Sequence, residues 1–71
     1  MNEEVNAKVA EYEEHLRDAE RDIERALQVV CPLRGEELAE VRRTLGEALA
    51  FVQFNICGTF KLYDNPDIEV A

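Results

Sequence analysis

The sequence predicts an all-α fold, an antiparallel hairpin of two long helices with a short extended or β-like C-terminal tail. Three observations favour it: a heptad repeat over residues 3–30, a proline and glycine break at 31–35, and a second helical apolar pattern over 36–57. A chain of 71 residues forms one domain with a thin core. Because such cores usually need help from metals, disulfides or oligomerisation, we expect the hairpin to form a homodimer or higher oligomer, as in a four-helix bundle.

The first helix is predicted over residues 3–30. Its apolar residues recur in alternating steps of four and three without a break, which is the spacing of a coiled-coil seam. This seam consists of Val5, Val9, Tyr12, Leu16, Ala19, Ile23, Ala26 and Val30. Asn2 can cap the start, and Glu3 and Glu4 suit the positive end of the helix dipole.

The turn is predicted at residues 31–35. Pro32 lacks an amide proton and disfavours helical geometry in the preceding residue, so the first helix should end near Val30. Gly35 is an acceptable N-cap for the second helix, because glycine is among the residues that helix starts tolerate. A linker this short returns the chain antiparallel to itself and predicts an αα-hairpin.

The second helix, predicted over 36–57, carries the candidate oligomer interface. Its main stripe is Leu38, Val41, Leu45, Ala48 and Val52. From Ala48 onward the helix is apolar nearly all round, which requires cover on more than one side. Gly46 and Ala50 form a small second face that another backbone can approach. We therefore predict an interface of Leu45, Gly46, Leu49, Ala50, Phe51, Val52, Phe54 and Ile56.

The C-terminal arm is predicted over 58–71. Gly58 stands where a left-handed helix cap is expected. Residues 59–63 alternate polar with apolar and favour a short strand or an extended arm, and Asn65-Pro66-Asp67 suits a turn. A small β-hairpin would be marginal alone in water. The favoured alternatives are a tail that lies across the helices or one that exchanges with another subunit.

Charge narrows the classes of partner. The net charge is −8, with sixteen acidic residues against eight Lys and Arg, which argues against a nucleic-acid-binding surface. It favours solubility or a basic protein partner. The acidic start lacks a signal-peptide pattern, and no apolar run has membrane-spanning length, so we expect a cytoplasmic protein without a membrane segment.

The single histidine gives little indication of a metal site. Glu11 and Asp18 lie within one helical turn of His15, but Tyr12 occupies the position where a Glu-x-x-His metal motif needs glutamate. His15 also falls at the edge of the seam. We interpret it as a surface or boundary histidine, with a metal ligand as the alternative.

The two cysteines do not indicate a catalytic or metal site. Cys31 and Cys57 each end a helix, where the dipole opposes thiolate formation, and they lack metal-ligand spacing. No phosphate-binding loop, nucleophile elbow or zinc-protease motif is present in the sequence. We therefore expect no enzyme activity and assign no catalytic, cofactor or metal residues.

Three hypotheses for function follow. The first is a non-enzymatic hairpin that acts through homo-oligomerisation and protein–protein contacts, as an adaptor, assembly factor or regulatory subunit. The second is an acidic inhibitor or nucleic-acid mimic that occupies a basic groove on a partner. The third is a metal enzyme assembled across subunits around His15.

Overall fold

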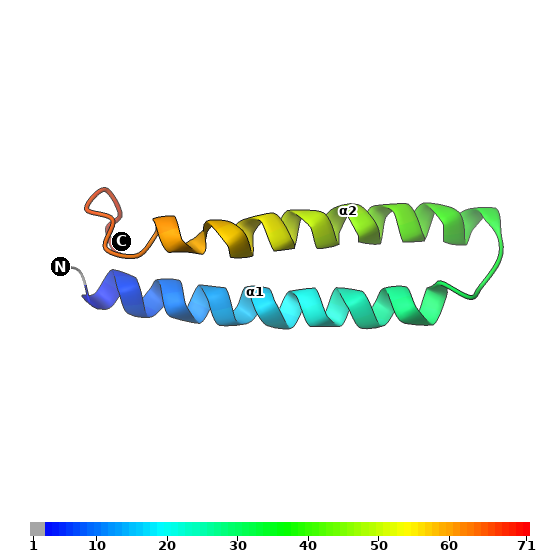
Figure 1. The fold of residues 1–71 in the computed structure, drawn as a ribbon, viewed down its shortest axis with the longest axis horizontal. Helices are drawn as coiled ribbons and strands as arrows, with labels where there is room; N and C mark the ends of the chain where they lie inside the picture. The colour runs from blue at the N-terminus through cyan, green and yellow to red at the C-terminus, as the bar shows by residue number, and fades with distance from the viewer. Residues whose placement is uncertain (1–2) are drawn as a thin grey trace.

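The computed structural model describes residues 3–71 and has the form of a rod in which two antiparallel helices lie side by side (Figure 1). Helix α1 spans Glu3–Val30 and α2 spans Glu36–Gly58, followed directly by η1, a 3-10 helix over Thr59–Lys61. The all-α hairpin is confirmed, and the helix bounds match the predicted ones to within one residue. The predicted cap at Asn2 lies outside the described residues.

The rod is far more elongated than a globular chain of this size. It measures 52 × 20 × 16 Å, and its radius of gyration is 16.1 Å. A compact chain of this length has a radius of gyration of about 11 Å. The molecule is therefore a single layer of two helices rather than a closed bundle.

The core is one line of contacts between the helices. Val5 and Val9 of α1 are buried, with 2% and 7% of their surface exposed. The later seam residues are only half-buried, namely Leu16, Ala19, Ile23, Ala26 and Val30 of α1. Their half-buried partners in α2 are Leu38, Leu45, Ala48, Leu49, Val52 and Ile56. The two predicted stripes thus face each other, except that Tyr12 and Val41 are 42% and 37% exposed. A pair of helices covers only one side of each helix.

The turn follows the predicted chemistry. The Cys31 amide donates to the Leu27 carbonyl at 2.8 Å, and α1 ends before Pro32 as expected. Gly35 is the N-cap of α2, with φ 135° and ψ 150°, and its carbonyl accepts a hydrogen bond from the Ala39 amide at 3.1 Å. This conformation is almost exclusive to glycine, so the residue type determines where α2 can begin.

A charged side chain from α2 completes the end of α1. The last turn of α1 contains no basic residue, and its final carbonyls lack helical partners. Arg42 Nη1 donates to the Leu33 carbonyl at 2.8 Å and lies 3.4 Å from the Val30 carbonyl. A positive charge is thereby held at the negative end of the α1 dipole. The contact joins the two helices at the turn end of the rod.

The start of the C-terminal arm differs from the prediction. Gly58 has φ −89° and ψ −5°, so the expected left-handed cap at Gly58 is wrong. The chain continues into η1 instead of a strand because the Thr59 amide and hydroxyl both reach the Ile56 carbonyl, the hydroxyl at 2.8 Å. These bonds extend the helical path by one more turn. The left-handed conformation occurs at Asp64, with φ 55°.

The rest of the arm lies against the beginning of α1. Asn6 and Asp64 exchange two hydrogen bonds of 2.8 Å, one from the Asn6 amide group and one from the Asp64 backbone amide. The Asp67 amide donates to Asn65 Oδ1 at 2.9 Å, which forms the turn expected there. Leu62, Ile68 and Val70 line a shallow apolar hollow together with Val5, Val9 and Tyr12. The structure contains no strand within residues 3–71.

Candidate interaction surface on the second helix

The eight predicted interface residues divide between two faces of α2. Leu45, Leu49, Val52 and Ile56 are half-buried in the seam. Gly46, Ala50, Phe51 and Phe54 are exposed. The structure thus brings the first set against α1 and leaves the second set open to solvent.

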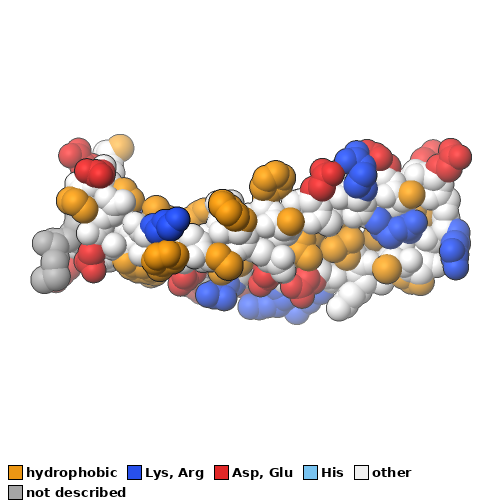
Figure 2. Space-filling view, turned by 45° about the horizontal axis from the view of Figure 1, so that its top comes forward, with side chains coloured by type: hydrophobic (Ala, Val, Ile, Leu, Met, Phe, Trp, Pro, Cys, Tyr) orange, Lys and Arg blue, Asp and Glu red, His pale blue; other side chains and the backbone are white. Residues whose placement is uncertain are grey.

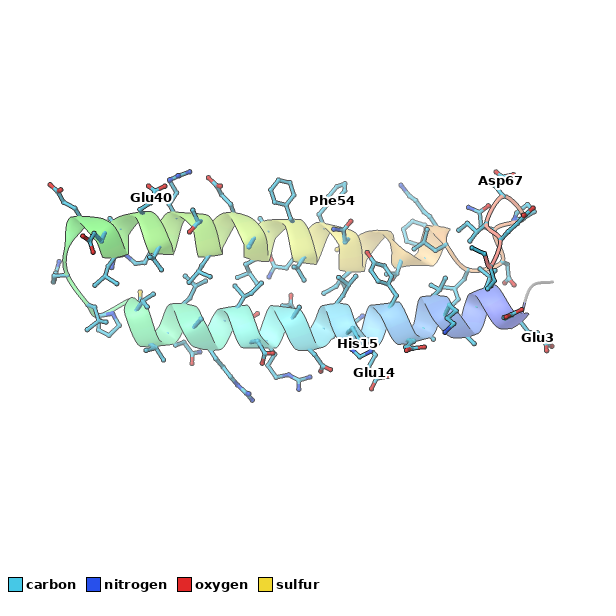
Figure 3. The ribbon with its side chains drawn as sticks, turned by 180° about the vertical axis from the view of Figure 1, so that it is seen from behind. Glu3, Glu14, His15, Glu40, Phe54 and Asp67 are labelled. Carbon is cyan, nitrogen blue, oxygen red and sulfur yellow. The ribbon has the colours of Figure 1, made fainter. Side chains whose placement is uncertain are left out.

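All members of the exposed set except Gly46 belong to a larger apolar surface, which we call the outer ridge. It consists of Ala50, Phe51, Phe54, Cys57 and Phe60, all exposed. The side chains of Phe51, Phe54 and Phe60 are 70%, 76% and 70% exposed, and these are all the phenylalanines in the chain. Phe54 points away from α1 (Figure 3). Large aromatic side chains are usually buried, and a contiguous exposed group of them marks an interaction site.

Two shallow hollows accompany the ridge. One is lined by Glu47, Ala50, Phe51, Phe54 and Asn55. The other is lined by Phe54, Cys57, Gly58, Phe60 and Lys61. Figure 2 shows hydrophobic side chains along this part of the rod and a concentration of charged side chains toward the end with the turn. The ridge therefore has protruding aromatic rings with shallow hollows beside them, and a second apolar surface can pack against it.

The outward side of α2 and of η1, which continues it, also follows a heptad repeat. The residues at alternating steps of four and three are Glu40, Thr44, Glu47, Phe51, Phe54, Gly58 and Lys61. Six of these seven are exposed, and Gly58 is half-exposed. The repeat is polar in its first half and apolar in its second, with one lysine at the end. Sequence reasoning from the apolar residues alone missed this second seam, because its first three members are polar.

Ion pairs order the polar half of this outer seam. Arg43 binds the Glu40 carboxylate through two of its nitrogens, and Arg43 Nη1 donates to Glu47 Oε1 at 2.8 Å. Glu40 and, less strongly, Glu47 raise the pKa of the Arg43 guanidinium. At the other end of the outer seam, Lys61 Nζ lies 5.8 Å from the ring centre of Phe60. The outer seam is thus weakly acidic at one end and basic at the other.

A buried polar contact holds the ridge in place. The Thr59 side chain is only 3% exposed, and its hydroxyl lies 2.6 Å from Glu13 Oε2 on α1. The same hydroxyl lies 2.8 Å from the Ile56 carbonyl, so its single proton can be donated to either oxygen. Thr59 lies three residues after Ile56 and so continues the spacing of the α2 stripe that faces α1. That spacing is the sequence signal that could have identified Thr59 as a buried residue. Thr59 ties the end of α2 to α1 just before Phe60.

The histidine and cysteines are dispersed. His15 is exposed, as predicted, and points away from α2 (Figure 3). No group of three side chains suited to binding a metal occurs among residues 3–71. Cys31 and Cys57 are exposed free thiols near opposite ends of α2. The structure therefore does not gather these residues into one site.

The comparisons with known proteins give no family assignment. The chain shows no significant match to any protein-family model, curated protein or solved structure. Neither described helix is long and apolar enough to cross a membrane. Function is therefore inferred from the surfaces of the molecule alone.

Proposed function

We propose that this protein is a non-enzymatic helical hairpin that works through homo-oligomerisation and protein–protein contacts, as an adaptor, assembly factor or regulatory subunit. Its accessible surface is the supporting observation. The 8.1 kDa chain exposes 5609 Å². A compact monomer of this mass exposes about 4,500 Å². The surplus of roughly 1,100 Å² is similar to the area of about 800 Å² or more that each partner buries in a stable complex.

A second copy of the chain is the partner that best fits this surplus. Each hairpin supplies one layer of helices, and a second layer is what an amphipathic layer needs to enclose a core. The outer ridge offers three exposed phenylalanines for that contact. Burying one phenylalanine side chain contributes about 1.5–3 kcal/mol, so several from each copy can offset the entropy lost on association.

The distribution of charge is compatible with self-association despite the net charge of −8. Glu14 projects from α1 on the side facing away from α2 (Figure 3). Pairing through the outer ridge of α2 would leave this acidic side of α1 in solvent in both copies. Repulsion between the copies is then weakened by distance and by salt.

The mass of the protein in solution tests the proposal. Light scattering on a sizing column at micromolar concentration should give twice the chain mass of 8.1 kDa, or a higher multiple. A mass of one chain that persists when the concentration is raised tenfold would contradict it.

The alternative is an acidic inhibitor or nucleic-acid mimic that binds a basic groove. The exposed acidic residues of α1, among them Glu14, Asp18 and Glu24, favour it. Arg21 lies 3.6 Å from Asp18, however, and such interleaved basic residues interrupt the acidic face. Binding of a basic partner through this face should weaken steeply with salt, whereas assembly through the outer ridge should not.

A further inference from the structure

We infer that the second copy binds antiparallel, α2 against α2, with the twofold axis between Phe51 and Phe54. This inference specifies how the copies pair and therefore rests on the proposed function. It follows from three features of the outer seam: its heptad spacing, the position of its aromatic pair and the placement of its charges.

The heptad spacing determines which residues can meet. When two such seams pack antiparallel, each seam residue lies in one layer with a residue from the seam of the partner. An axis between Phe51 and Phe54 places Phe51 against the partner's Phe54, and Glu47 against the partner's Gly58. Each ring then packs on another ring, which adds about 0.5–1.5 kcal/mol per pair beyond the area that it buries.

Small residues beside the outer seam allow the helices to approach. Ala50 and Cys57 are exposed next to the two phenylalanines. Apart from its chain neighbours and the backbone of its own helix, nothing lies within 4 Å of the position that a Cβ would occupy on Gly58. The partner's Glu47 can therefore lie over Gly58 without a clash from this chain.

The charges favour the antiparallel arrangement over the parallel one. In the antiparallel register, Lys61 meets the partner's Thr44 and lies about one helical turn from both the partner's Glu40 and the partner's Glu47. That acidic pair shares only one arginine, Arg43, so it carries a net negative charge that Lys61 can balance. Parallel pairing would instead set each lysine and each glutamate beside its own copy, which is unfavourable.

The arm gives a second electrostatic reason. The start of α1 and the C-terminal arm lie at the same end of the rod (Figure 1). Acidic residues gather there, including Glu3, Glu4, Asp64, Asp67 and Glu69. Parallel pairing would place two such ends together, and antiparallel pairing separates them.

Disulfide crosslinking tests this register. In a chain with both natural cysteines changed to serine, Glu47→Cys and Gly58→Cys are made as separate proteins. The two are mixed, unfolded, refolded together and oxidised gently. Cysteines in the same layer can bond because their Cα atoms lie within about 7 Å. Glu14→Cys, on the opposite side of the rod, is the matched control.

The antiparallel register predicts a covalent dimer from the mixed proteins and none from either protein alone, since two copies of one cysteine would lie about 16 Å apart along the axis. Crosslinking of each protein with itself would show parallel pairing and overturn the inference. The same applies to no crosslink in a sample that light scattering shows to be dimeric. A monomer by light scattering would instead refute the proposed function. Glu14→Cys should not crosslink with either protein.

Discussion

The outward faces of the two helices differ, although both helices turn a heptad stripe toward each other. On α1 this face carries interleaved charges, such as the Asp18 and Arg21 pair at 3.6 Å, and Glu14 and His15 point away from α2 (Figure 3). On α2 it carries Phe51 and Phe54, each at least 70% exposed. Water solvates the charged side chains of the first face well, whereas the exposed rings of the second face are unfavourable in water. The inward stripes therefore hold the hairpin together, whereas of the two outward faces only that of α2 leaves large apolar side chains uncovered.

The largest expected effect is on assembly. Phe51→Glu should weaken the proposed dimer about 100-fold or more, because it removes a ring that the pairing would bury in each copy and introduces a charge into that apolar contact. Glu14→Ala on the α1 face is the control and should leave the dimer unchanged. Sedimentation equilibrium over a range of concentrations measures both. Equal dissociation constants for the two variants would mean that the two faces do not differ as proposed.

The next effect concerns the contact that joins the helices near the ridge. Thr59→Val should lower the free energy of unfolding by about 1–3 kcal/mol, because it leaves a partly buried Glu13 carboxylate without its hydroxyl partner. In samples dilute enough to contain single chains, Thr44→Val is the control, since the exposed Thr44 hydroxyl contacts only carbonyls of its own helix. Urea unfolding followed by circular dichroism measures both. A loss for Thr44→Val as large as that for Thr59→Val would count against the Glu13 contact.

Replacing two of the glycines with alanine should change the stability of the fold in opposite directions. Gly35→Ala should destabilise the fold by about 1–3 kcal/mol, because φ 135° is strained for any side chain. Gly46→Ala should stabilise it by up to about 1 kcal/mol, because Gly46 lies inside α2 with open space where a Cβ would be. Thermal unfolding compares them. A loss of stability for Gly46→Ala would show that a partner backbone approaches that position.

Charge reversal on α1 should have a small effect. The double variant Glu14→Lys and Glu24→Lys changes two exposed residues, so its free energy of unfolding should stay within about 0.5 kcal/mol of the parent. Light scattering should still show the dimer. If this variant kept its fold and mass but no longer bound a basic partner protein, the acidic mimic would become the better proposal.

No intrachain disulfide should form. Cys31 precedes α2 and Cys57 lies near its end, which separates them by roughly 30 Å along the helix axis. A disulfide requires Cα atoms within about 7 Å. After mild oxidation of the native protein, non-reducing electrophoresis and mass analysis should show no monomer with a Cys31–Cys57 bond. Finding that bond would contradict the hairpin.

The sequence alone was sufficient for the hairpin. An unbroken heptad repeat, a proline after Val30 and a glycine at 35 are local signals, and each acts within a few residues of backbone. The helix bounds and the inward stripes therefore followed from periodicity. The acidic balance likewise followed from composition.

The tail shows where local signals fail. Residues 59–63 alternate as a strand does, but Thr59 is buried against α1 and bonds back to Ile56, so the chain continues as η1. The Asn6 and Asp64 pair then fixes the arm across α1. The Thr59–Glu13 contact and the Asn6–Asp64 pair both join residues that are distant in sequence, and no local pattern tells which residue is the partner.

The tertiary structure also decided the division of the apolar residues in α2. The steps of the main stripe already placed Val52 inward, but the widened pattern after Ala48 did not separate Leu49 from Phe51 and Phe54. Only the packing of α1 shows that Leu49 lies in the seam while Phe51 and Phe54 face outward. Periodicity identifies the sides of a helix that avoid water, but the position of the neighbouring helix decides which of those sides is already covered. The uncovered side is the one on which a partner can be proposed.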